Sequence, residues 1–176
     1  MKKVKIISII GVFLISFLCH FLYDIFPNYI FSIFFPVNES IWEHMKIIVS
    51  SILFYSPIEY FIWKKKKIEV NNFLLSNIMM GICAIIIYLI IFLPIYNMIG
   101  ENMIINISLL LLVYIIVEII GYYLLKAPKM PFQKAIAIII ITLTFLIFWY
   151  LTYFPIKNKL FIDTTKNQYG IIKKEP

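Results

Sequence analysis

Four candidate metal ligands lie within the first 44 residues: His20, Asp24, Glu39 and His44. The two histidines are the only ones in the chain. Imidazole and carboxylate groups are common ligands of Zn²⁺ and of other divalent transition metals. They also serve as acid and base in proton transfer. The residue types therefore predict either a divalent metal site, for an ion such as zinc, or an acid–base pair.

Helical spacing places these side chains at the facing ends of two elements. His20 and Asp24 are four residues apart, so a helix over this segment carries both on one face. Glu39 and Glu43 repeat this spacing where the next helix begins, whereas His44 is turned about 100° from Glu43. The two elements are joined by a short connection, so we expect their side chains to meet. The candidates for catalysis are Glu39, Glu43 and His44.

Part of this cluster has a purely structural explanation. Ser40 and Glu43 fit the S-x-x-E capping box, which satisfies free amides at a helix start. Trp42 and Lys46 suit a membrane–water boundary as anchors. Neither explanation accounts for two histidines that each neighbour a carboxylate, so we favour a functional site.

The composition indicates a membrane protein. Hydrophobic residues make up 62% of the 176 residues and charged residues only 14%, whereas a soluble domain has about 25% charged residues. The net charge of +7 comes from lysine alone, because the chain has no arginine. A nucleic-acid binder would present basic residues, arginine among them, on a polar face. We therefore expect the lipid bilayer as a partner and no nucleic acid.

Five apolar runs are long enough to cross a bilayer as helices, since about 20 residues suffice. They cover residues 4–26, 41–63, 73–96, 103–125 and 133–154. Residues 28–35 are too few to cross and predict an interfacial or re-entrant piece. The predicted fold is all-α: a polytopic bundle of about five transmembrane helices over residues 1–154, followed by a tail over residues 155–176.

The distribution of lysine predicts the orientation, because cytoplasmic loops are enriched in basic residues. Ten lysines precede the first span or join the second to the third and the fourth to the fifth, whereas the opposite connections hold only Lys46. The tail carries further lysines, but five spans place the two ends on opposite sides. We predict a protein of the cytoplasmic membrane with its N-terminus inside and its tail outside. The cluster of His20 and His44 then faces outward.

A second polar layer lies nearer the predicted cytoplasmic side and consists of Glu59, Asn77 and Glu118. A carboxylate within the membrane is costly unless it is paired, protonated or hydrated. Two carboxylates on different helices could hold a cation or relay a proton. Alternatively, the lysines at 64–67 and 126 fold back and neutralise them.

The tail contains turn-forming residues around Asp163, and the pair Tyr169–Gly170 suggests a fixed bend. Two interpretations stay open. The tail folds back as a lid, with Asp163 close to His20 or His44, or it is a mobile end.

Three segments resemble a known family. "H-F-L-Y-D", "F-P-V-N-E-S-I-W-E-H-M-K" and the tail segment "D-T-T-K-N-Q-Y-G" are similar to small multi-pass membrane proteins of Gram-positive bacteria, a family that has no assigned function. A fainter similarity links Ser16 to His20 and Asn38 to His44 with the alkaline-ceramidase and adiponectin-receptor superfamily of membrane hydrolases. That superfamily places a histidine pair for zinc late in the chain and has seven spans. Here no histidine follows His44.

Three functions remain open. We favour binding or transport of a cation or small polar solute, in a homodimer or with a partner membrane subunit, because five helices make a narrow pathway. The first alternative is a metal-dependent hydrolase that acts on a lipid head group at the outer face. The second is a structural or regulatory subunit. The chain lacks a Walker loop, G-x-S-x-G and C-x-x-C, so ATP hydrolysis, serine hydrolysis and dithiol chemistry have no support.

Overall fold

The computed structural model describes residues 2–171, and five long helices dominate it. They are α1 (Lys2–Ile25), α3 (Ile41–Lys65), α4 (Phe73–Ile99), α5 (Met103–Lys126) and α6 (Gln133–Tyr153). Each is long and apolar enough to cross a membrane. A short helix, α2 (Tyr29–Phe34), follows the first. The predicted fold class, an all-α multi-pass membrane protein, is confirmed, and every predicted span ends within three residues of a helix end.

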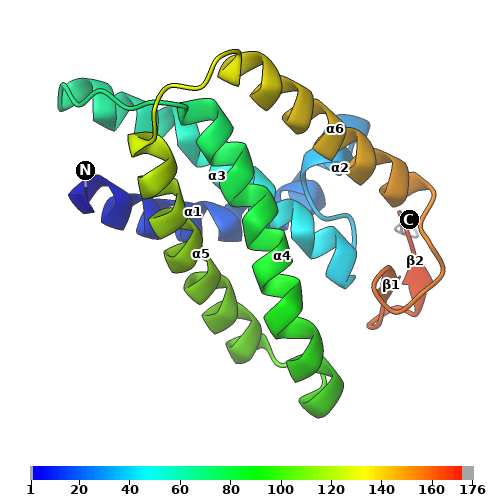
Figure 1. Ribbon diagram of the computed structural model, residues 1–176. Coiled ribbons are helices and arrows are strands. Elements are labelled where there is room, and N and C mark those ends of the chain that lie inside the picture. The colour runs from blue at the N-terminus through cyan, green and yellow to red at the C-terminus, as the bar shows by residue number, and fades with distance from the viewer. Residues whose placement is uncertain (1, 172–176) are drawn as a thin grey trace.

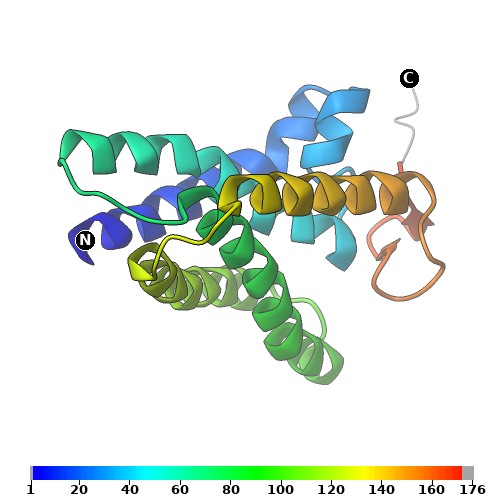
Figure 2. The ribbon, with the colours of Figure 1, turned by 45° about the horizontal axis from the view of Figure 1, so that its top comes forward.

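Helix α3 is the central element of the bundle. In its apolar stretch of 18 residues, 61% of the residues are buried, compared with 17–33% in the corresponding stretches of the other four long helices. Helix α1 packs along α3, while α4 packs against both α3 and α5 (Figure 1). Helix α6 contacts α4 and α2 and is the least buried of the five (Figure 2). Lipid would therefore cover most of α6, whereas α3 can carry polar groups inside the protein.

Side-chain caps determine where three of the helices begin. Asn28 Oδ1 accepts a hydrogen bond from Phe31 N at 3.0 Å, and Ser40 Oγ accepts one from Glu43 N at 3.3 Å. Asn102 accepts from the first amides of α5 in the same way. Such caps satisfy amides that have no partner within the helix. They fix the starts of α2, α3 and α5 at one end of the bundle, opposite the N-terminus (Figure 1). We call this the outer end, following the predicted orientation.

The tail folds against the outer end. Strands β1 (Ile162–Asp163) and β2 (Gln168–Tyr169) form an antiparallel hairpin. Trp42 N donates to Leu160 O at 2.8 Å, and Asn38 Nδ2 donates to Gly170 O at 2.7 Å. The tail is thus joined to the start of α3 over its described part, residues 155–171. The remaining residues of the predicted tail, 172–176, lie outside the described residues.

Candidate functional site

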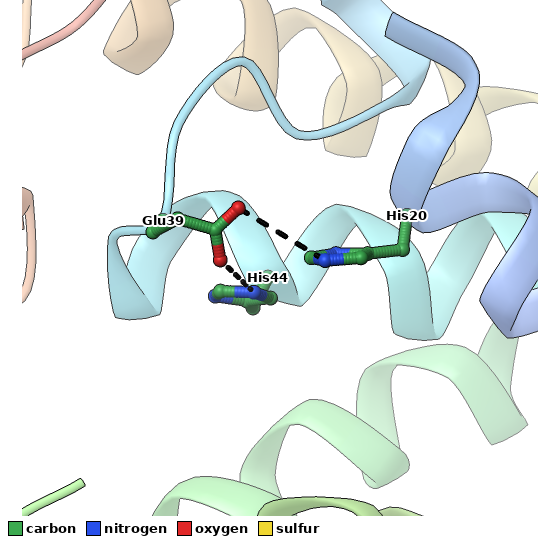
Figure 3. A group of neighbouring side chains, drawn as sticks. All are labelled: His20, Glu39 and His44. Carbon is green, nitrogen blue, oxygen red and sulfur yellow. Dashed lines mark ion pairs between the residues drawn. The ribbon is translucent and has the colours of Figure 1, made fainter. Parts of the chain in front are cut away.

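Three of the four predicted metal ligands meet at the outer end. His20 comes from α1, Glu39 from the connection before α3, and His44 from the first turn of α3 (Figure 3). Each offers one ligand atom, and these atoms all lie within 4.8 Å of one another. Glu39 Oε2 is 3.3 Å from His44 Nε2, and Glu39 Oε1 is 3.9 Å from His20 Nε2. The arrangement can hold a single cation.

The ring of His44 faces two acceptors. Its Nδ1 lies 2.9 Å from Ser40 O, and its Nε2 faces the Glu39 carboxylate. A neutral imidazole carries one N–H and cannot donate to both. When Nδ1 donates to Ser40 O, Nε2 keeps its lone pair, which is how a metal-binding histidine is commonly oriented. A cation between Nε2 and Glu39, or a second proton on the ring, satisfies this pair.

The main chain of Glu39 is held by the tail. Glu39 N donates to Asp163 Oδ2 at 3.2 Å, while Asp163 Oδ1 accepts from Thr165 N at 2.8 Å and from Thr165 Oγ1 at 2.6 Å. Burial alone would raise the pKa of Asp163, but the hydrogen bonds from Thr165 and the backbone lower it below its ordinary value. The tail therefore places an ionised carboxylate directly behind the candidate site.

The side chain of Glu39 remains half-exposed. The neighbouring His44 imidazole lowers the pKa of Glu39 below its ordinary value, although partial burial acts in the opposite direction. Glu39 is thus ionised at neutral pH and is suited to bind a cation.

Two other predicted residues are not among the three converging ligands. Asp24 is one helical turn beyond His20 and is not among the three side chains whose ligand atoms converge. Glu43 is buried: it accepts from Val37 N at 3.0 Å and from Thr152 Oγ1 at 2.8 Å. Glu43 therefore ties α3 to the preceding connection and to α6.

The expected interfacial role of Lys46 is wrong. Its side chain is 0% exposed, and Nζ lies 2.6 Å from Glu43 Oε2 and 2.7 Å from Ser32 O. A buried carboxylate needs a partner, and the pairing with Glu43 supplies one. Lys46 is thus part of the protein interior.

The predicted inner layer is an ion-paired cluster. Lys5 Nζ lies 2.8 Å from Glu59 Oε1 and 2.8 Å from Glu118 Oε2, and all three side chains are buried. The neutralising lysine thus comes from α1, whereas the alternative of neutralisation by lysine had named those at 64–67 and 126. Asn77 is also buried, and its amide donates to Phe73 O within α4.

A cavity of about 340 Å³ adjoins the three outer ligands. Its polar lining at the outer end includes His20, Glu39, His44, Glu101, Lys159 and Thr164. Its deeper lining includes Ser16, Ile48, Tyr88, Phe92 and Leu110. The helices α1, α3, α4 and α5 and the tail thus all contribute to one space.

Sequence reasoning missed several lining residues. Glu101 lies in a connection that the predicted topology already placed at the outer end, which was a usable signal. Tyr88 lies within an apolar span and has no such signal. From the tail, Lys159 and Thr164 line the cavity, whereas Asp163 and Tyr169 are not among its lining residues.

Comparison with known proteins relates the chain to a family. The model of a family of unknown function (DUF6512) matches residues 1–171. None of the curated proteins and none of the solved structures with which the chain was compared matches it. The predicted resemblance to a family without an assigned function is confirmed.

Proposed function

The chain belongs to this family of unknown function, and from the geometry of its outer end we propose that it binds a divalent transition-metal ion through His20, Glu39 and His44. The observation that carries the proposal is the convergence of their ligand atoms within 4.8 Å. Two imidazoles and one carboxylate suit zinc, and three protein ligands leave a coordination position open for a further group. The Ser40 carbonyl beside His44 Nδ1 supports this assignment by orienting Nε2 toward the ion.

A second candidate is a metal-dependent hydrolase that acts on a lipid head group. The cavity favours it, because a substrate there would touch the three ligands and an apolar wall together. The ion would supply a Lewis acid and an activated water molecule. Glu101 lines the same cavity and offers a carboxylate that could move a proton. The buried pair with Lys46 leaves Glu43 poorly placed for this role.

Transport has weaker support than cation binding. A path through the bundle would use the inner carboxylates, yet both Glu59 and Glu118 already contact Lys5. Neither carboxylate lines the cavity at the outer end. The geometry thus favours a site that acts at one membrane face.

Metal analysis of the protein tests the proposal. We expect near-stoichiometric zinc or manganese in protein purified in mild detergent without chelators. The double variant His20→Ala/His44→Ala should lose the ion, whereas Glu69→Ala, which removes an exposed carboxylate from the α3–α4 connection, should keep it. Asp24→Ala shows whether Asp24 acts as an additional ligand. A wild-type protein that stays metal-free after incubation with zinc would overturn the proposal.

A further inference from the structure

The lining of the cavity changes from polar to apolar along its depth. Glu101 and Lys159 lie with the three ligands at the outer end, whereas Ile48 and Leu110 lie deeper. Ile48 follows His44 by four residues on α3, which places it about 6 Å further into the membrane. A ligand that fills the whole space must therefore combine a polar head with an apolar body.

One side of the cavity faces the lipid. Phe17 and Phe21 of α1 and Met103 of α5 line it, and they are 39%, 52% and 74% exposed. Phe17 and Phe21 lie on the outer half of α1, where we expect hydrocarbon around them, and Met103 is the first residue of α5. Access between them favours a ligand that is already in the bilayer over a solute that arrives from water.

The charge at the outer end favours an anionic head group. Among the side chains that line the cavity, Lys159 and a bound divalent ion would together exceed the charges of Glu39 and Glu101 by one positive charge, and Asp163 behind Glu39 does not line it. A phosphate group complements this excess and can also occupy the open position on the ion. This step rests on the proposed function, whereas the apolar part of the cavity does not depend on the ion.

We infer that the cavity binds one hydrocarbon chain of a phosphate-bearing membrane lipid, with the head group at His20, Glu39 and His44. The cavity volume of about 340 Å³ falls in the range of roughly 300–1,000 Å³ that is typical of small-molecule sites. The hydrocarbon chain of the lipid lies against Ile48, Phe92 and Leu110, and its phosphate lies beside the ion and Lys159.

Photo-crosslinking in nanodiscs tests this inference. The nanodiscs contain phosphatidylcholine and a trace of a probe that carries a diazirine midway along one acyl chain. One probe is a phosphatidylglycerol, and the other is a diacylglycerol with the same chains but no phosphate. Labelled residues are identified by mass spectrometry. We expect the phosphatidylglycerol probe to label Ile48 and Leu110 more strongly than the diacylglycerol probe.

Space-filling variants connect the labelling with the cavity. Leu110→Trp should reduce labelling of Ile48 to the level seen without light, whereas Ile139→Trp, at a 58% exposed position of α6, should leave it unchanged. Ile107→Trp, at a partly exposed lining position, repeats the test with less strain on the core. Labelling confined to lipid-facing residues such as Ile139 would overturn the inference. So would labelling of Ile48 that persists in both Leu110→Trp and Ile107→Trp.

The two probes separate this inference from the proposed metal site. In the metal-loaded protein, equal labelling of Ile48 and Leu110 by both probes would overturn the preference for a phosphate-bearing lipid. If metal analysis shows no ion but both probes label Ile48, the proposed metal site is wrong, and the inference that the cavity binds a hydrocarbon chain stands. If the ion is bound but no deep label forms, the cavity inference alone fails.

Discussion

His44 Nδ1 lies 2.9 Å from the carbonyl oxygen of Ser40, the residue whose hydroxyl caps α3. The same residue thus starts the helix with its side chain and orients a candidate metal ligand with its main chain. Helix initiation and site geometry are coupled at this one position.

Ser40→Ala separates these two roles, because it removes the hydroxyl and keeps the carbonyl. We expect a loss of about 1 kcal/mol of unfolding free energy from the missing cap, with unchanged metal affinity. Thermal unfolding in detergent and titration with zinc measure the two quantities. A folded Ser40→Ala protein with weakened metal binding would show that the hydroxyl group positions His44.

Asp163 should affect metal binding without touching the ion. Its two carboxylate oxygens accept from Glu39 N and from Thr165, and an amide has only one acceptor oxygen. In Asp163→Asn one of these contacts is lost, so the main chain at Glu39 is less well held. We expect zinc affinity to fall by about 10- to 100-fold, as for other groups that support a metal ligand.

Tyr169→Phe is the matched control for Asp163→Asn, because Tyr169 lies in the same hairpin and its side chain is 36% exposed. Isothermal titration with zinc compares the two variants with the wild type. Unchanged affinity in Asp163→Asn would show that the hairpin does not support the site.

Lys46→Met tests the buried pair beside the site. Removing the lysine leaves Glu43 as a buried carboxylate without its cation, and such losses cost about 3–5 kcal/mol. The double variant Lys46→Met/Glu43→Gln should recover part of this loss, because it also removes the uncompensated charge. Thermal unfolding in detergent measures both. If Lys46 were an interfacial anchor, Lys46→Met would change the unfolding temperature only slightly.

The spans and the cluster around His20 and His44 could be predicted because each depends on local sequence. An apolar run of sufficient length crosses the membrane whatever its neighbours are. A short connection between α1 and α3 brings their facing ends together. Both inferences need only the order of residues along the chain.

The pairings inside the bundle could not be predicted in the same way. Lys5 was counted with the lysines that indicate orientation, yet it lies between Glu59 and Glu118. Its position depends on how α1 and α5 are rotated toward each other. Helices that are apolar on all sides give little periodic signal for that rotation. The same limit explains why Tyr88 in α4 was missed as a cavity residue.

The Lys5 cluster provides the last test, since it also distinguishes a structural role from transport. Lys5→Met leaves Glu59 and Glu118 buried without a cation, so we expect a loss of about 3–5 kcal/mol of unfolding free energy. Adding Glu59→Gln and Glu118→Gln should restore part of it. Lys3→Met, at an exposed position of the same helix, is the control and should unfold like the wild type. Equal unfolding temperatures for Lys5→Met and Lys3→Met would contradict a stabilising pair and would favour a role for the two carboxylates in moving cations or protons.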